Sequence, residues 1–217
     1  MYKTVVFDLD GTLLNTLTDL ADAGNRLCRK YGWPTHERQA YRYFVGNGIP
    51  KLVERLAPAD QRTPAVLEAA LADFKRDYGQ HLRDTTAPYP GIPEMLANLK
   101  ANGVQLAVFS NKADALAKEV VKDYFGTQYF TIVRGQMTGV APKPAAEGTN
   151  ALLQALHADP ASTLYVGDSN VDVETAHSAN LPCCGAVWGF RTREELNAAG
   201  AEYLAENSDE LYDVIMK

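Results

Sequence analysis

Two aspartates lie two residues apart near the start of the chain, in the segment FDLDGT at 7–12. Asp8 and Asp10 follow a short apolar run, and alternate residues of an extended chain point to the same side. Gly11 permits a tight turn and a close approach of the backbone to a ligand. Such a pair could bind a cation, or one carboxylate could attack a substrate while the other transfers protons. An acidic turn without a function would give the same pattern.

A second pair of aspartates, Asp168 and Asp172, lies in the segment YVGDSNVD at 165–172, between an apolar run and a helical pattern. If this segment meets the first one, four carboxylates repel one another unless a cation lies between them. Mg²⁺ suits such a site, because it is a hard ion that takes oxygen ligands, including phosphate oxygens. By itself, the pattern also fits a helix start with acidic capping residues.

Two further segments contain groups that could bind an anion. Ser110 and Asn111 end another apolar run, where a hydroxyl, an amide and backbone N–H groups at a helix start can bind phosphate. Lys143 stands between two prolines, which restrict the backbone, so its ammonium could neutralise phosphate charge from a fixed position. Taken singly, the first segment is an ordinary helix cap and the second an exposed loop lysine.

The elements that position these segments are predicted from hydrophobic periodicity. Apolar runs typical of buried strands lie at 3–9, 104–109, 129–133, 163–166 and 183–188, and helical patterns lie at 92–102, 113–124, 145–157 and 171–179. Strands that alternate with helices indicate a parallel sheet with helices on both faces, which binds ligands at the carboxyl ends of its strands. The predicted fold class is therefore α/β, with a Rossmann-like parallel-sheet core.

The stretch 15–86 interrupts this alternation, because it shows only helical patterns. A helix with one apolar face is predicted over 17–31, and Thr35 is the predicted cap of the next helix. We therefore predict an inserted helical cap domain at 15–86 and a core, catalytic domain formed by 1–14 and 87–217.

Composition excludes several other classes of protein. The 217 residues carry a net charge of −6 and no basic run, which disfavours nucleic acid and anionic membranes as partners. No segment has the pattern of a signal peptide or of a transmembrane helix. The three cysteines, at 28, 183 and 184, give no disulfide framework, and Cys183 and Cys184 fit small buried strand residues. We expect a cytoplasmic protein.

Together the four segments resemble the haloacid dehalogenase-like superfamily, whose motifs occur in this order over nearly the whole chain: D-x-D-G-T, S-N, K-P and G-D-x-x-x-D. The resemblance implies that Asp8 attacks phosphorus and forms an aspartyl-phosphate. It implies that Asp10 protonates the leaving group and then deprotonates the hydrolytic water. Lys143 would bridge the nucleophile and the phosphoryl oxygens.

The same resemblance implies the remaining ligands of the site. Mg²⁺ would be the cofactor, held by Asp8, Asp168 and the backbone carbonyl of Asp10, with Asp172 supporting it directly or through water. The phosphoryl group would be bound by the motif residues Ser110, Asn111 and Thr12.

A glycine-flanked segment of the predicted cap, FVGNGI at 44–49, adds a finer resemblance to the bacterial phosphoglycolate phosphatase branch. It implies that Gly46, Asn47 and Gly48 contact the leaving group of a small phosphate ester, 2-phosphoglycolate above others. A plain helix–helix turn would have the same composition. Asn15 and Arg134 depart from the usual pattern of that branch, which leaves phosphatases for sugar phosphates, nucleotides or pyrophosphate as alternatives.

Other chemistries of the superfamily agree less well with the sequence. A sugar phosphomutase of the β-phosphoglucomutase type would retain every core residue and is the main alternative. Asp10 argues against a dehalogenase and against a phosphonate hydrolase, whose imine-forming lysine would have to be Lys51, predicted to be a solvated helix residue. A non-catalytic member would be expected to lose Asp8, Asp10 or Lys143. The sequence leaves monomer or homodimer open.

Overall fold

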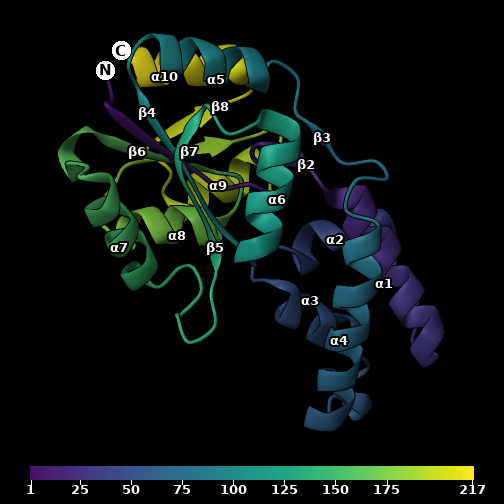
Figure 1. Ribbon diagram of the computed structural model, residues 1–217. Coiled ribbons are helices and arrows are strands. Elements are labelled where there is room, and N and C mark those ends of the chain that lie inside the picture. The colour runs from purple at the N-terminus through teal and green to yellow at the C-terminus, as the bar shows by residue number, and fades with distance from the viewer.

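A six-stranded sheet, in which all neighbouring strands run parallel, forms the centre of the molecule in the computed structural model of residues 1–217 (Figure 1). The strand order is β5-β4-β1-β6-β7-β8. The strands are β1 (Thr4–Phe7), β4 (Gln105–Ala113), β5 (Phe130–Gln136), β6 (Thr163–Gly167), β7 (Cys183–Ala186) and β8 (Tyr203–Ala205). The predicted α/β fold class with a Rossmann-like sheet is confirmed.

The register of the central strands brings their carboxyl ends to the same level. Phe7 at the end of β1 pairs with Val108 of β4 on one side and with Val166 of β6 on the other. The residues that follow these three positions therefore emerge side by side at one edge of the sheet. This is the edge at which parallel sheets bind ligands.

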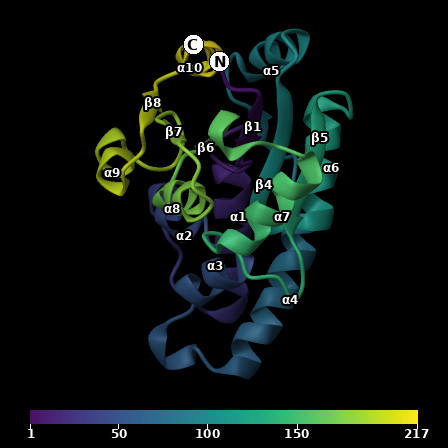
Figure 2. The same ribbon diagram turned by 90° about the vertical axis from the view of Figure 1, so that its left-hand side faces the viewer.

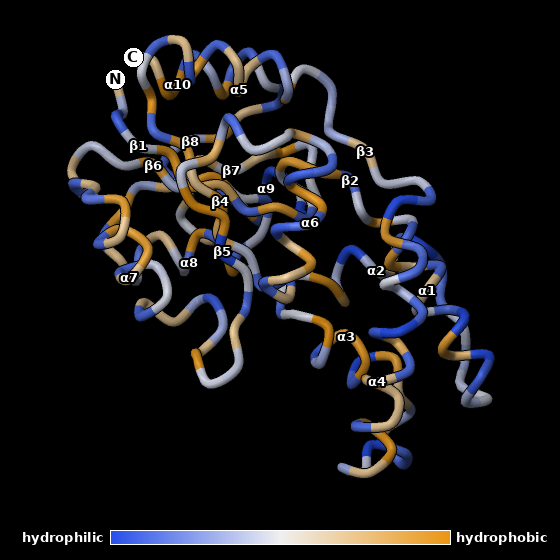
Figure 3. Tube along the Cα trace, viewed as in Figure 1, coloured by the Kyte–Doolittle hydropathy of each residue, from blue (hydrophilic) through white to orange (hydrophobic).

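Helices cover both faces of the sheet, because successive side chains of each strand point to opposite faces. Val5 and Phe7 pack in one apolar cluster with α5 (Ile92–Ala101), α6 (Asp114–Phe125) and α10 (Ser208–Met216). Val6 packs in a second cluster with residues of α7 (Ala146–Leu156), α8 (Asn170–Ser178) and α9 (Arg193–Ala199). In the hydropathy view the strands are mostly orange, while blue segments lie on the outer helices (Figure 3).

Four helices form a separate group on the side away from the chain termini (Figures 1 and 2). They are α1 (Leu17–Tyr31), α2 (Arg38–Phe44), α3 (Ile49–Leu56) and α4 (Pro64–Gln80), with a short 3₁₀ turn at Ala59–Gln61. The chain enters and leaves this group through β2 (Leu14–Asn15) and β3 (Ala87–Pro88), which pair antiparallel. The division into a cap at 15–86 and a core stays a prediction, and we adopt the word cap for α1–α4.

The connection between cap and core is tied by one buried carboxylate. Asp19, in the first turn of α1, accepts hydrogen bonds from the backbone N–H and the hydroxyl of Thr85 and of Thr86. Because these residues lie on the two segments that link cap and core, Asp19 fixes the links to each other.

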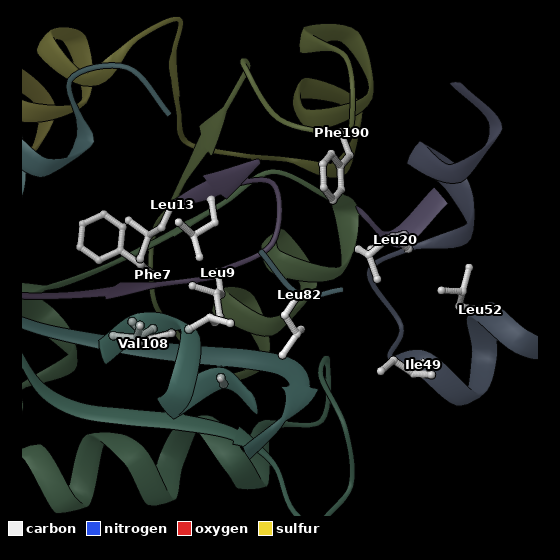
Figure 4. Close-up of a cluster of buried hydrophobic side chains, with 14 of the residues drawn as sticks. Phe7, Leu9, Leu13, Leu20, Ile49, Leu52, Leu82, Val108 and Phe190 are labelled. Carbon is white, nitrogen blue, oxygen red and sulfur yellow. The ribbon is translucent and has the colours of Figure 1, made fainter. Parts of the chain in front are cut away.

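Apolar side chains continue from the core into the cap (Figure 4). Phe7 and Leu9, at the end of β1, belong to the same buried cluster as Leu20 of α1 and as Ile49 and Leu52 of α3. The cap is therefore joined to the core by a shared apolar cluster at this edge of the sheet.

The predicted strands and core helices are present, with ends that shift by a few residues. The largest shift is in β4, which continues to Ala113 although its predicted end was 109. Thr35 was a wrong prediction, because α2 begins at Arg38 with Glu37 as its N-cap. Cys183 and Cys184 are buried in β7, as predicted. None of the helices has both the length and the apolar composition that crossing a membrane requires.

Candidate active site

Three buried carboxylates meet at the edge of the sheet. Asp8 follows β1, Asp168 follows β6 and Asp172 lies in the first turn of α8. One oxygen of each lies within 4.8 Å of the others. Such crowding of buried negative charge is unfavourable without a cation.

Lys143 supplies one positive charge to this cluster. Its Nζ lies 2.9 Å from Asp8 Oδ1 and 2.7 Å from Asp172 Oδ1, and it donates to the hydroxyl of Tyr165 at 3.1 Å. Burial would lower the pKa of Lys143, but the carboxylates of Asp172 and Asp8 outweigh it and hold that pKa well above its usual value. Lys143 is thus a fixed ammonium at the carboxylate that the sequence nominates as nucleophile.

The donor set fits a hard divalent cation. Burial, with smaller repulsion from Asp172 and Asp10, raises the pKa of Asp8 to about 6 despite Lys143. Burial, with repulsion from Asp172 and Asp8, holds the pKa of Asp168 well above its usual range. Asp8 Oδ1 is buried and accepts no hydrogen bond, although Lys143 Nζ lies 2.9 Å from it. An oxygen in this state is a suitable ligand for Mg²⁺.

The oxygens of Asp172 are engaged elsewhere. Its Oδ1 accepts from Lys143, and its Oδ2 accepts from the backbone N–H groups of Asp168 and Ser169 and from the Ser169 hydroxyl. Asp172 therefore closes the first turn of α8 and holds Lys143. Asp8 and Asp168 face the cluster with more of their oxygen capacity free.

The position of Asp168 is fixed by two hydrogen bonds and by the space that one glycine leaves. The hydroxyl of Thr12 donates to Asp168 Oδ1 at 3.1 Å, and the N–H of Phe190 donates to Oδ2 at 2.7 Å. A Cβ at Gly11 would lie 2.3 Å from Asp168 Oδ2, and the φ of +91° there also requires glycine. Thr12, nominated as a phosphate ligand, thus directs its side chain to Asp168.

Asp10 is bound by a second buried lysine, Lys112. Lys112 Nζ lies 3.0 Å and 3.2 Å from the two carboxylate oxygens of Asp10. It also donates to the hydroxyl of Tyr78, which reaches the site from α4 of the cap. No role is predicted for Lys112 from the sequence, although it directly follows Ser110 and Asn111.

Asn111 organises the site through its amide. The side chain donates to the carbonyl of Gly46 at 2.9 Å and to that of Lys143 at 3.3 Å, and accepts from the N–H of Lys143 at 2.9 Å. It therefore joins the cap loop to the loop that carries the buried lysine. Ser110, also buried, lies beside it.

A cavity lies between these groups and the cap. Its wall consists of the polar residues Asp8, Asp10, Ser110, Asn111 and Lys112 of the core, and of Leu20, Val45, Gly46, Gly48, Ile49, Leu52 and Tyr78 from the cap. Gly46 and Gly48 both have positive φ. Asn47 is absent from the wall, and its Oδ1 accepts from Arg55 instead.

The cap is held in place beside this cavity by two arginines. Arg42 of α2 donates to the carbonyls of Gly189 and Phe190 in the core. Arg191 in turn donates to the carbonyls of Arg42 and Val45 in the cap. Since the N–H of Phe190 holds Asp168, the same core loop contacts both the cap and the carboxylate cluster.

Addition of Mg²⁺ is expected to raise the melting temperature of the metal-free protein, and more so at higher pH. The pKa of Asp8 is raised to about 6 in the fold, from about 3.9 in the unfolded chain. Protonation of Asp8 therefore stabilises the metal-free fold fully below about pH 4, and this contribution is lost as pH rises through about 6. Metal binding needs the ionised form of Asp8. The gain in melting temperature is therefore largest at the higher pH, where the metal-free protein has lost the contribution of protonated Asp8.

At a hundredfold excess over its Kd, Mg²⁺ should add about 2.7 kcal/mol, or about 5–10 °C for a chain of this length. Thermal unfolding followed with chelator and with Mg²⁺ from about pH 4 to about pH 8 measures the effect. The Asp8→Asn variant serves as control, since its pH dependence in the chelator should be flatter. If Mg²⁺ leaves the melting temperature unchanged above about pH 7, the proposed cation site is excluded.

Comparison with known proteins adds to this geometry. A profile of the family described as haloacid dehalogenase-like hydrolase matches residues 5–186. A phosphoglycolate phosphatase of Chromobacterium violaceum is 31% identical over 216 residues, which cover 98% of this chain and 96% of the relative. Another, of Thiobacillus denitrificans, is 31% identical over 191 residues, with 87% and 84% covered.

Solved structures are similar to this chain over nearly its whole length. A crystal structure from Lactobacillus delbrueckii subsp. bulgaricus, whose suggested activity is that of a phosphoglycolate phosphatase, matches with a TM-score of 0.93 at 28% identity, covering 99% of this chain and 98% of the other. CbbY from Rhodobacter sphaeroides, solved with phosphate, has a TM-score of 0.80 at 23% identity over 97% and 96% of the two chains. At that identity the likeness extends to the fold.

Proposed function

Because the chain belongs to the haloacid dehalogenase-like hydrolase family, we propose that it is a phosphatase that hydrolyses 2-phosphoglycolate through an aspartyl-phosphate on Asp8. The observation that carries the proposal is that two different lysines contact the two aspartates of the first motif. Lys143 contacts Asp8, the nominated nucleophile, while Lys112 holds Asp10 beside the cavity. One carboxylate is thus placed for attack and the other for proton transfer.

The reaction has two displacements at phosphorus. A carboxylate oxygen of Asp8 forms a bond to phosphorus as the bond to the leaving oxygen breaks, and Asp10 gives that oxygen a proton. Asp10, now a carboxylate, takes a proton from water as the water oxygen attacks the phosphorus of the aspartyl-phosphate. Inorganic phosphate leaves, and Asp8 and Asp10 return to their starting states.

Positive charge is needed because a carboxylate and a phosphate dianion repel each other. Lys143 offsets this repulsion from its fixed place beside Asp8. We assign Mg²⁺ to Asp8 and Asp168, with the backbone carbonyl of Asp10 as a further ligand and Asp172 behind them. Bound there, the ion would supply charge against the phosphoryl oxygens. Ser110 lies on the cavity wall, where its hydroxyl can bind the same phosphoryl group.

A small leaving group is favoured by the chemistry of the cap wall. Leu20, Ile49 and Leu52 face the cavity and offer no hydrogen bond to the hydroxyls of a sugar. The loop at Gly46 and Gly48 brings backbone close to the cavity, where N–H groups can meet the carboxylate of glycolate. The named activity of the relatives agrees with this choice. A sugar phosphomutase is disfavoured by the same apolar wall.

A phosphonate hydrolase would need Lys51 as its imine-forming amine. It pairs with Glu54 at 2.8 Å on the exposed side of α3 and does not line the cavity. The prediction that it is a solvated helix residue is therefore confirmed. The cytoplasmic location and the choice between monomer and homodimer stay predictions from the sequence.

Purified protein is expected to release phosphate from 2-phosphoglycolate with a specificity constant at least tenfold above that for hexose phosphates, nucleotides or pyrophosphate. Tenfold corresponds to about 1.4 kcal/mol of differential transition-state stabilisation. The assay uses the same panel with the Asp8→Asn protein, which corrects for contaminating phosphatases. A tenfold preference for another ester would refute the substrate, and formation of glucose 6-phosphate from β-glucose 1-phosphate would favour the mutase.

A further inference from the structure

Asp10, the proton donor and acceptor of the proposed reaction, lies against a buried lysine, Lys112, that takes no part in either displacement at phosphorus. The side chain of Lys112 is 2% exposed and that of Asp10 is 14% exposed. The ammonium lies within 3.2 Å of both carboxylate oxygens, so it fixes the direction of the carboxylate and not merely its charge. Burial would lower the pKa of Lys112, but Asp10 and Tyr78 hold it above its usual value, which keeps the amine charged.

Tyr78 connects this pair to the cap. Its hydroxyl accepts a hydrogen bond from Lys112 at 2.9 Å, and the ammonium lies 4.9 Å from the centre of its ring. Burial raises the pKa of Tyr78 to about 12, so the hydroxyl remains neutral. A continuous polar chain therefore runs from α4 through Lys112 on β4 to Asp10 after β1, each from a different part of the sequence.

We propose that Lys112 and Tyr78 are positioning residues that hold the carboxyl group of Asp10 toward the leaving group while the cap covers the cavity. The proposal rests on the phosphatase function above. Its physical basis is that Lys112 and the cation at the three-carboxylate cluster compete for the carboxyl group of Asp10. A carboxylate two residues after Asp8 could otherwise turn to the cation at the three-carboxylate cluster. The contact with Lys112 keeps it apart, and Tyr78 ties that contact to the presence of the cap.

The effect expected of such residues depends on the leaving group. Ethyl phosphate and 2-phosphoglycolate release poor leaving groups that need a proton, whereas 4-nitrophenyl phosphate releases a more acidic phenol that needs it less. Loss of position at Asp10 should therefore slow phosphoryl transfer from the two alkyl esters much more than from the aryl ester. General acid catalysis of this type contributes about 10²–10⁴-fold, which sets the upper limit.

The test measures the first turnover, with protein in excess, for wild type, Tyr78→Phe and Lys112→Met on the three esters. Lys112→Met should slow both alkyl esters by about tenfold or more and the aryl ester by less than about threefold. Tyr78→Phe should give a smaller change with the same selectivity. The matched control is Tyr41→Phe, which removes another buried cap hydroxyl, bonded to Asn25, and should leave all three rates unchanged.

A double variant tests whether Lys112 acts through Asp10. If it does, Lys112→Met in an Asp10→Asn background should add less than about twofold to the loss on alkyl esters, because the two residues work as one unit. Full additivity would overturn the proposal. Tyr78→Phe keeps the buried ring, so its selectivity still decides the matter if Lys112→Met does not fold.

Two other outcomes would also overturn it. Equal slowing of alkyl and aryl esters would reduce Lys112 and Tyr78 to a structural role. Slowing of 2-phosphoglycolate alone, with ethyl phosphate unaffected, would make Lys112 a receptor for the substrate carboxylate. Absence of phosphate release from every ester by the wild-type protein would instead refute the phosphatase function itself, so the two failures are distinguishable.

Discussion

Replacement of Asp8 by Asn is expected to abolish phosphate release while the protein stays folded. Asn has nearly the same shape as Asp, and the side chain is buried, so packing at the end of β1 should be kept. The amide is a poor nucleophile and cannot form the aspartyl-phosphate. We expect less than a few per cent of the wild-type rate with either alkyl or aryl esters, since both require attack on phosphorus.

The measurement is phosphate release with saturating Mg²⁺, together with mass spectrometry of acid-quenched protein for a phosphorylated Asp8 peptide. Asp159→Asn is a matched control, because Asp159 caps the 3₁₀ turn at Pro160–Ser162, at the amino end of β6 and the opposite edge of the sheet. Its rate should be unchanged. An Asp8→Asn protein that retains more than a few per cent of the rate would remove Asp8 as nucleophile.

The meeting of Asp8, Ser110 and Asp168 could be anticipated from the sequence for a physical reason. Each follows a buried apolar run, and parallel strands present their carboxyl ends at a common edge. The level register of β1, β4 and β6 then leaves little freedom in where these side chains emerge. The helical stretch 15–86 was equally visible, because its apolar residues recur at helical spacing and show no strand alternation.

Lys112 could not be anticipated in the same way. The apolar run of β4 ends at Phe109, so periodicity gave no reason to extend the strand through the polar residues that follow. In the structure β4 continues to Ala113, with irregular pairing to β5 between Phe109 and Ala113. Lys112 lies in this irregular segment and is buried. The contacts with Asp10 and Tyr78, which are distant in sequence, explain why a lysine is tolerated there.

The contacts between cap and core could not be predicted from the sequence either. The family resemblance of the cap loop predicts that Asn47 contacts the leaving group, although a plain helix–helix turn has the same composition. Its side chain turns to Arg55, eight residues away on α3, and only the structure could decide between these directions. The reciprocal hydrogen bonds of Arg42 and Arg191 join residues almost 150 positions apart, to backbone carbonyls that carry no sequence signal.

Asp10→Asn is expected to slow phosphoryl transfer from 2-phosphoglycolate by about 10²–10⁴-fold, the range typical of general acid catalysis. The amide oxygen can still accept a hydrogen bond from Lys112, so the side chain should keep its place while losing the transferable proton. The loss should be far smaller for 4-nitrophenyl phosphate, whose leaving group needs less protonation. Release of 4-nitrophenol in the first turnover reports this step alone.

The second half of the reaction should also fail in this variant, which gives an independent signature. Water attack on the aspartyl-phosphate needs a base, and Asn cannot accept the proton. An Asp10→Asn protein mixed with 4-nitrophenyl phosphate should therefore release about one equivalent of phenol rapidly and then stall as phosphorylated protein. Equal slowing of alkyl and aryl esters in the first turnover, without accumulation of the phosphorylated form, would contradict both roles of Asp10. Rapid phenol release followed by undiminished turnover would contradict the second role alone, and would require the proton of the attacking water to go to a different group.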